Sequence, residues 1–280
     1  MQKVESVADM RRVASTLKAN QGRLALVPTM GALHEGHAAL ISAAKEISGA
    51  VVVSIFVNPL AFGPNEPIAS YPRNLEADLA ICEALGVDAV FLPTVEEIYP
   101  KGYSTYVTEE AVSRNLCGIS RPTHFRGVTT FMLKLLNMIR PDVAVFGQKD
   151  VQQVAVLRKM AADLGIEVEL AVVPTVRAAD GLALGVRNQG MTASMRGEAL
   201  ALSRALFKAK EMVASGVRST DRVVAEATHI LSQHRRVRII YISTVDIATM
   251  EPTREIVPDR TMLAIAAWID EVRLIDNIVL

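Results

Sequence analysis

The chain has 280 residues, of which 50% are hydrophobic, and its 30 basic residues are balanced by 30 acidic ones. A formal net charge of zero argues against a protein that binds nucleic acid or an anionic membrane, because both require a basic excess. With only Cys82 and Cys117, we expect no disulfide framework and a reducing, cytoplasmic compartment. The charged N-terminus and the lack of an apolar run of bilayer length predict neither a secretory signal nor a membrane span.

The first informative pattern is a strand, a tight turn and a helix between residues 24 and 45. Leu24–Val27 is an apolar run typical of a buried strand, and Ala38–Lys45 is typical of a helix. The glycine-containing turn places backbone N–H groups at a helix N-terminus, where free donors and the helix dipole stabilise a phosphate. His34 and His37, three residues apart, can share one face of that helix. The sequence therefore predicts a site for a phosphate chain.

Two other interpretations of this turn stay open from the residues alone. The histidines can be ordinary surface residues, or they can be zinc ligands beside Glu35. However, His34-Glu35-Gly36-His37 is one residue shorter than the H-E-x-x-H spacing of metalloproteases, and no third ligand is obvious. We therefore predict no protein-bound metal and prefer the phosphate interpretation.

Strands and helical segments alternate up to about residue 174. The predicted strands are Leu24–Val27, Val51–Val57, Val87–Leu92, Val143–Phe146 and Val168–Val173. This alternation predicts an α/β fold, a Rossmann-like doubly wound parallel sheet covered on both faces, over residues 1–174. Ligands bind such sheets at the carboxyl ends of the strands. We therefore expect the loops Asn58–Tyr71, Gly147–Asp150 and Pro174–Asn188 to converge on one crevice with the histidine turn.

The alternation of strands and helical segments ends after Pro174. Two helical stretches, about 194–214 and 221–233, precede three strand-like runs, Val237–Thr244, Met262–Trp268 and Val272–Val279. Consecutive strands without helices between them are typical of an antiparallel sheet. The sequence predicts a smaller C-terminal α+β domain, residues 175–280, that closes over the active site.

Five ordered motifs give the chain a specific resemblance. They are Pro28-Thr29-Met30-Gly31 with His34-x-Gly36-His37; Asn58-Pro59-Leu60-Ala61-Phe62 with Tyr71-Pro72-Arg73; His124-Phe125-Arg126-Gly127; Gly147-Gln148-Lys149-Asp150-Val151-Gln152-Gln153; and Asp180-Gly181-Leu182-Ala183 with Arg187-Asn188. Together they resemble the pantothenate synthetase (pantoate–β-alanine ligase) family, which has the HxGH signature of nucleotidyltransferases. The resemblance covers essentially the whole chain, including the terminal Arg273-Leu274-Ile275-Asp276-Asn277.

The resemblance implies an ATP-dependent reaction in two steps. ATP and (R)-pantoate give a pantoyl-adenylate and pyrophosphate, and the amine of β-alanine then displaces AMP to form pantothenate. The phosphoanhydride is needed because a carboxylate is a poor acyl donor, so catalysis is mainly positioning and neutralisation of charge. Mg²⁺ is implied with ATP, since it bridges phosphate oxygens and leaves little trace in the sequence. A homodimer formed through the N-terminal domain is implied as well.

The resemblance also assigns the site residues. The catalytic group comprises His34, His37, Lys149 and Arg187, with His37 as a proton donor. The ATP-binding set is Met30, Gly31, Ala32, Leu33, His34, Glu35, Gly36, His37, Gly147, Gln148, Lys149, Asp150, Val176, Leu184, Gly185, Val186 and Arg187. Val176 would contact adenine through its backbone, and Ala61 and Gln153 stand at substrate-binding positions. His124 is interpreted as mostly structural, and a role as general acid or base is the alternative.

Two departures from the family lie within this predicted site. Ala61 stands where the family has a glutamine that binds pantoate, and Gly185-Val186 stand where it has two serines that contact the ATP phosphates. Alanine can neither donate nor accept a hydrogen bond from its side chain. The chain can therefore be a working synthetase with compensation elsewhere, a paralogue that ligates another acid or amine, or a nucleotide-binding variant with low or no activity. The retained His34, His37 and Lys149 favour the first.

Overall fold

The computed structural model describes residues 1–63 and 68–280, so residues 64–67 of the predicted loop Asn58–Tyr71 lie outside the described residues. The chain divides into two compact units. The first comprises Met1–Glu110 with Arg121–Pro174, and the second comprises Ala111–Ser120 with Thr175–Leu280. The sequence placed residues 111–120 in the N-terminal domain, whereas in the structure they group with the second unit.

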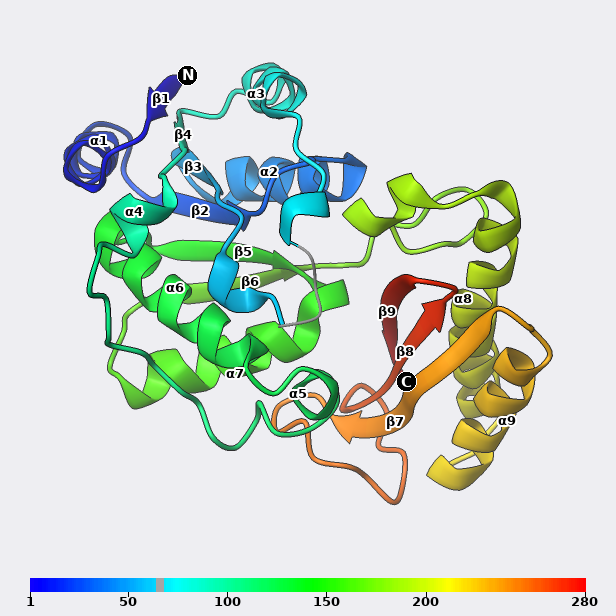
Figure 1. Cartoon of the computed structure of the whole chain (residues 1–280). Helices are drawn as coiled ribbons and strands as arrows, with labels where there is room; N and C mark the ends of the chain where they lie inside the picture. The colour runs from blue at the N-terminus through cyan, green and yellow to red at the C-terminus, as the bar shows by residue number, and fades with distance from the viewer. Residues whose placement is uncertain (64–67) are drawn as a thin grey trace. The chain divides into compact units, whose positions relative to one another are not determined.

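The first unit is built on a parallel sheet of six strands (Figure 1). In spatial order these are β1 (Gln2–Val4), β4 (Ala89–Phe91), β3 (Ala50–Ile55), β2 (Leu24–Thr29), β5 (Val143–Gly147) and β6 (Glu169–Val173). The order reverses between β2 and β5, as in a doubly wound sheet, which confirms the predicted fold class. The edge strand β1 was not predicted, because three residues are too few to show a periodicity.

Helices cover both faces of this sheet because alternate strand residues point to opposite sides. Leu24 and Leu26 pack with the helices on one face, and Ala25 and Val27 pack with those on the other. On the first face lie α1 (Val7–Gln21), α6 (His124–Ile139) and α7 (Val151–Asp163); on the second lie α2 (Glu35–Ile47) and α3 (Leu75–Ala84) (Figure 1). The shorter helical segments of this unit are η1 (Pro59–Ala61), η2 (Ile68–Ser70), α4 (Val95–Ile98) and η3 (Gln148–Asp150).

The second unit contains an antiparallel sheet in the order β7 (Val237–Asp246), β8 (Thr261–Ile269) and β9 (Val272–Val279). Two long helices, α8 (Ala193–Ala214) and α9 (Thr220–Ser232), pack their apolar faces against this sheet. Thr192 and Ser219 cap the helices with their hydroxyl oxygens. The α+β architecture predicted for this part of the chain is confirmed. Two short segments, α5 (Cys117–Ser120) and η4 (Val186–Gly190), complete the unit.

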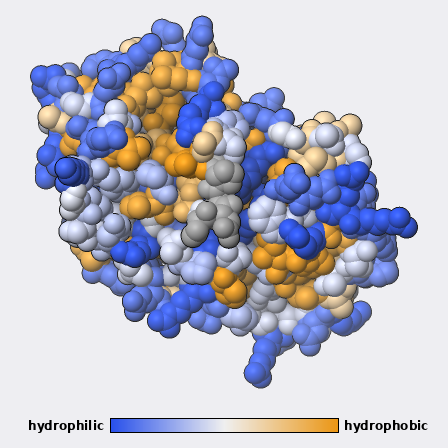
Figure 2. Space-filling view, viewed as in Figure 1, coloured by the Kyte–Doolittle hydropathy of each residue, from blue (hydrophilic) through white to orange (hydrophobic). Residues whose placement is uncertain are grey.

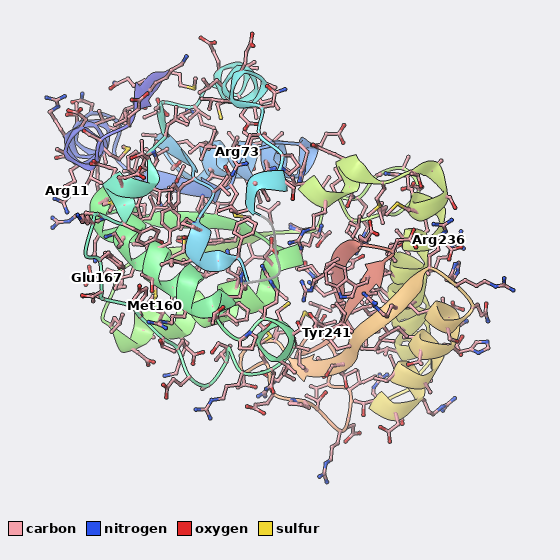
Figure 3. All side chains as sticks on the ribbon, viewed as in Figure 1. Arg11, Arg73, Met160, Glu167, Arg236 and Tyr241 are labelled. Carbon is pink, nitrogen blue, oxygen red and sulfur yellow. The ribbon has the colours of Figure 1, made fainter. Side chains whose placement is uncertain are left out.

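Side-chain contacts explain why residues 111–120 group with the second unit. The Sγ atom of Cys117 lies 3.2 Å from the hydroxyl of Tyr241, which is on β7 (Figure 3). Arg273 donates to the hydroxyl of Ser120 at 3.3 Å, and Asn115 donates to the carbonyl of Met250 at 3.0 Å. These contacts join residues more than a hundred positions apart, so no local pattern in the sequence indicates them.

On the face drawn in Figure 2, hydrophobic residues reach the surface in separate patches bordered by hydrophilic ones. Large exposed hydrophobic residues come from separate parts of the chain, for example Ile119, Leu164 and Val257. Across residues 1–63 and 68–280, no helix combines the length and the apolar character that a membrane span needs.

A close backbone approach fixes η1 against the first turn of α6. Asn58 accepts from the N–H of Leu60 and donates to the carbonyl of Gly127 at 3.0 Å, and the hydroxyl of Tyr99 donates to Asn58 at 2.8 Å. A Cβ atom on Gly127 would lie 2.0 Å from the carbonyl oxygen of Leu60. Only glycine allows this approach, and the contact positions the segment that ends in Ala61.

We expect Gly127→Ala to lower the free energy of unfolding by about 3 kcal/mol, because the new methyl group meets rigid backbone rather than a flexible side chain. The matched control is Gly197→Ala in α8, where a Cβ would meet nothing within 4 Å and the better helix propensity of alanine adds roughly 0.5–1 kcal/mol. Urea denaturation followed by circular dichroism measures both. Equal stability of the two variants would contradict the close approach.

Candidate active site

The site forms where the strand order of the first unit reverses. β2 and β5 are neighbours, with Ala25 opposite Val143, and the histidine turn follows β2 while the Lys149 segment follows β5. The carboxyl ends of adjacent parallel strands meet at one edge of a sheet, and a crevice opens there when the chain leaves them in opposite directions. The predicted segments 30–37 and 147–150 therefore come together in the structure.

A buried carboxylate holds the turn between β2 and α2. Asp78, on α3, accepts from the N–H of Ala32 at 2.9 Å and from the N–H of Leu33 at 2.6 Å. Gly31 and Ala32 both have left-handed φ angles, +82° and +52°. A Cβ on Gly31 would lie 3.0 Å from an Asp78 oxygen and 3.1 Å from Ile55, so this position requires glycine. No sequence pattern indicates this role of Asp78, because one acidic residue among several in a helix has no distinguishing spacing.

The two histidines begin helix α2 and stabilise each other's position. His34 is the N-cap, and its Nδ1 accepts from the N–H of Gly36 at 3.0 Å. The Nδ1 of His37 accepts from the N–H of His34 at 3.2 Å, and the two ring centroids are 4.1 Å apart. Because Nδ1 accepts in both rings, each neutral imidazole carries its proton on Nε2. The pair therefore offers two Nε2–H donors.

Burial keeps both imidazoles neutral near pH 7. It lowers the pKa of His34 to about 4, helped by the positive charge of Lys149. It lowers the pKa of His37 to about 3, helped by the charges of His34 and Lys149. The effect of Lys149 on both rings shows that its ammonium group belongs to the same electrostatic site. Lys149 is thus the cation beside two uncharged donors.

Five backbone N–H groups of the turn are engaged by acceptors within the protein. The sequence suggested that N–H groups between Gly31 and His37 cradle a phosphate. In the structure, the N–H groups of Gly31, Ala32, Leu33, His34 and Gly36 already donate to Thr29, Asp78 and the two imidazoles. Side chains, rather than these five amides, are left to meet a ligand. In the part of the chain that the structure describes, no group of three or more His, Cys, Asp or Glu is placed to hold a metal ion.

The segment after β5 leads directly into α7. Gly147 ends the strand, Gln148, Lys149 and Asp150 form the 3-10 turn η3, and Gln153 lies half-buried in the first turn of α7. Asp150 occupies the N-cap position of α7, but its side chain makes no capping hydrogen bond.

Ala61, at the predicted substrate-binding position, lies at the end of η1. Its side chain is buried, and its carbonyl oxygen lies 2.8 Å from Nδ1 of His124 and 3.0 Å from Nη2 of Arg121. His124 therefore holds the backbone of the Ala61 segment, which supports its interpretation as a structural residue. The methyl group of Ala61 can make only apolar contacts.

The remaining predicted ATP-binding residues lie together on a hairpin of the second unit. The N–H of Leu184 donates to the carbonyl of Val176 at 2.9 Å, so these two residues are partners across the hairpin 176–184. Gly185 is extended, and Val186 and Arg187 begin η4. Asn188 donates to the carbonyl of Ala183 at 2.9 Å and closes this segment.

The comparisons with known proteins decide the family. A sequence model of the pantoate-beta-alanine ligase family matches residues 2–279. The chain belongs to this family. The pantothenate synthetase of Heliobacterium modesticaldum is 47% identical to it over 280 residues, which cover 100% of this chain and 99% of that protein. The family relationship confirms the resemblance drawn from the five motifs.

Solved structures of the pantothenate synthetase family share the fold. The enzyme from Thermus thermophilus has a TM-score of 0.94 and 39% identity, with 99% of both chains covered. The pantoate-beta-alanine ligase from Francisella tularensis, in complex with beta-gamma ATP and beta-alanine, has a TM-score of 0.79 and 31% identity, with 100% of this chain and 97% of that chain covered. The first is named a pantothenate synthetase and the second a pantoate-beta-alanine ligase, and the chain is an enzyme of this family.

The lowered pKa values of His34 and His37 predict a loss of stability in mild acid. The unfolded chain takes up protons near pH 6.5, whereas the folded chain resists them until about pH 4 and 3, so the stabilisation is present above pH 6.5 and is lost as the pH falls. We expect urea denaturation to show about 2 kcal/mol less stability at pH 5 than at pH 7.5 on account of His37 alone. His37→Gln should lose less between the two pH values. An identical loss in this variant would contradict the neutral, buried state of His37.

Proposed function

We propose that the chain condenses (R)-pantoate with β-alanine, using ATP, through a pantoyl-adenylate, and releases AMP and pyrophosphate. The observation that carries the proposal is the cluster at the β2/β5 reversal, where two neutral imidazole donors and Lys149 share one electrostatic site. A triphosphate needs donors and a cation, and the fold supplies both at the edge where such sheets bind ligands. Membership of the pantothenate synthetase family supports the same activity.

In the proposed adenylation step, a pantoate carboxylate attacks the α-phosphate of ATP and pyrophosphate leaves. His34 and His37 donate from Nε2 to phosphate oxygens, and Lys149 neutralises charge that moves onto the leaving group. Since the pKa of His37 is about 3 without a ligand, the ring is a weak hydrogen-bond donor with no second proton to give. The negative charge of bound ATP would raise that pKa, so the role of His37 as a proton donor depends on the nucleotide being present.

The other proposed roles follow the family assignment. Gln153 binds pantoate, Val176 contacts adenine through its backbone, and Arg187 offers its guanidinium to the polyphosphate. Met30 to His37, Gly147 to Asp150, and Leu184 to Arg187 complete the ATP-binding set. Mg²⁺ would accompany ATP and neutralise part of the charge of its phosphates. The proposed enzyme is a cytoplasmic homodimer that acts on small molecules and does not bind nucleic acid or a membrane.

A second candidate function rests on one specific observation. Ala61 presents a buried methyl group at the position of a pantoate-binding glutamine, and Gly185 and Val186 present no hydroxyl groups. A pocket that has lost hydrogen-bonding groups favours a less polar acid. The alternatives are therefore an adenylate-forming ligase for another acid or amine, and a variant that binds ATP with low or no turnover.

The release of pyrophosphate with pantoate alone tests the proposed function. An adenylate-forming ligase releases pyrophosphate from ATP in the presence of its acid without any amine. We expect release with pantoate and pantothenate formation after β-alanine is added. A faster reaction with another hydroxy acid would establish the paralogue, and ATP binding without any release would establish a binding protein.

Lys149→Ala should slow adenylate formation by two to three decades, because a lost transition-state charge contact costs roughly 3–4 kcal/mol. Single-turnover pyrophosphate release measures this rate. The control is Lys159→Ala, which removes an exposed lysine of α7 that pairs with Asp163. The assigned role of Lys149 fails if its variant keeps the wild-type rate.

Ala61→Gln should lower the KM for pantoate by about tenfold, since a recovered hydrogen bond to a buried polar group contributes ~1–2 kcal/mol. Gly185→Ser combined with Val186→Ser should act on the KM for ATP instead. Steady-state kinetics with each substrate varied in turn separates the two effects. If Ala61→Gln leaves pantoate use poor and abolishes activity on another acid, the paralogue interpretation is correct.

A further inference from the structure

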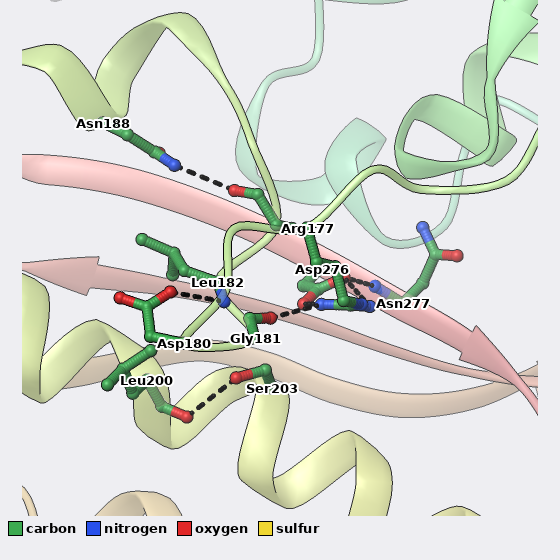
Figure 4. A network of polar contacts seen from close by, with 10 residues as sticks. Arg177, Asp180, Gly181, Leu182, Asn188, Leu200, Ser203, Asp276 and Asn277 are labelled. Atoms are coloured by element: carbon green, nitrogen blue, oxygen red, sulfur yellow. Dashed lines mark hydrogen bonds and ion pairs between the residues drawn. The ribbon is translucent and has the colours of Figure 1, made fainter. Parts of the chain in front are cut away.

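The hairpin 176–184 is attached to strand β9 by a buried ion pair between Arg177 and Asp276. Arg177 Nη1 lies 2.6 Å from Oδ2 of Asp276, and Arg177 Nη2 lies 3.0 Å from Oδ1 (Figure 4). The side chain of Asp276 is 3% exposed and that of Arg177 is 18% exposed. The planar guanidinium meets the carboxylate with two parallel bonds, which fixes the orientation of both groups.

Two more contacts hold the same guanidinium. Arg177 Nη1 donates to the carbonyl of Gly181, across the hairpin turn, at 3.2 Å, and the guanidinium carbon lies 5.1 Å from the ring centroid of Phe207 on α8. Gly181 has a left-handed φ of +91°, and a Cβ there would lie 3.5 Å from Phe207. Arg177 therefore joins the hairpin turn, helix α8 and strand β9 through one rigid group.

Strand β9 also contacts the segment that follows the hairpin. Arg187 Nη1 lies 3.5 Å from the carbonyl oxygen of Arg273, three residues before Asp276. The hairpin and η4 therefore both contact strand β9, the hairpin through Arg177 and η4 through Arg187. Beside these segments, Oγ1 of Thr175 and Oδ1 of Asn188 are buried without a hydrogen-bond partner. Buried polar atoms of this kind call for a polar ligand or water.

We propose that Arg177 and Asp276 are positioning residues for the nucleotide. They hold the hairpin on β9 so that Val176, Leu184 and Arg187 are presented in a fixed arrangement before ATP binds. The proposal rests on the proposed function, which assigns those three residues to ATP. A buried ion pair adds little stability compared with apolar side chains of similar size, whereas its geometry is highly specific. Orientation of the hairpin is accordingly the property that the pair controls.

Two substitutions of the pair test the proposal. Arg177→Lys keeps a cation opposite Asp276 but loses the paired bonds, and Asp276→Asn keeps the shape but loses the charge. We expect the Kd for ATP, measured by calorimetry, and the KM for ATP to rise about tenfold, with the KM for β-alanine within about twofold of wild type. In hydrogen exchange, the amides of Ala178 and Leu184, which close the hairpin, should lose protection while those of α9 keep it.

The matched control is Arg196→Gln. Arg196, on α8, donates from Nε to Asp180 of the same hairpin at 2.7 Å, and both side chains are about one-third exposed. Its ATP affinity should stay within about twofold of wild type, since an exposed ion pair contributes little.

The outcomes separate the two proposals. If folded Arg177→Lys binds ATP with wild-type affinity and keeps wild-type hairpin protection, the positioning role is wrong, whatever happens to Asp276→Asn. Reduced protection throughout the second unit, with unchanged ATP affinity in the folded fraction, would show a purely structural pair and overturn the role too. If the wild type binds ATP but forms no pantothenate, only the proposed function fails. Absence of ATP binding by the wild type overturns both.

Discussion

The turn from β2 into α2, which places both histidines, depends on the carboxylate of Asp78. Gly31 and Ala32 are consecutive left-handed residues, and for alanine this conformation costs roughly 1–2 kcal/mol. Two hydrogen bonds from backbone N–H groups to a buried carboxylate are worth roughly 1.5–3 kcal/mol each, so they offset the strain. The turn can therefore reverse tightly out of β2 and begin α2 at His34. This anchor acts together with the two imidazole Nδ1 atoms, which accept from the N–H groups of Gly36 and His34 and so fix where the rings lie.

The same anchor determines what kind of site the turn makes. Asp78 and the imidazole Nδ1 atoms occupy the N–H groups of Ala32, Leu33, His34 and Gly36, so these four amides differ from the free N–H groups of a glycine-rich phosphate loop. This edge of the sheet presents the Nε2–H donors of His34 and His37, which the capping contacts of α2 hold in place, and Lys149 is the cation beside them. Burial lowers the pKa of both rings, so they are neutral near pH 7 and three positive charges do not lie together at this edge of the sheet.

The sequence predicted the features that depend on periodicity and missed those that depend on distant contacts. Apolar runs such as Leu24–Val27 and Val143–Phe146 identified the parallel strands, and the shift to consecutive strands after residue 236 identified the antiparallel sheet. The role of Asp78 could not be predicted, because its partners, Ala32 and Leu33, are more than forty residues away. The grouping of residues 111–120 with the second unit could not be predicted either, because it depends on contacts of Cys117 with Tyr241 and of Ser120 with Arg273. The histidines and Lys149 were found through their motifs, but only the structure shows which amides are occupied.

In the second unit, strand β9 links the terminal motif to the hairpin. Leu274, Ile278 and Leu280 belong to the core formed with α8 and α9, and the alternation of a strand places Asp276 on the same face, where it meets Arg177. Arg273, three residues earlier, points to the opposite face and contacts residues 117 and 120. The hairpin is thus held by contacts outside Gly185 and Val186. Gly185 is extended, a conformation open to any residue. The attachment of the hairpin to β9 runs through Arg177 and Asp276 rather than through the side chains at positions 185 and 186.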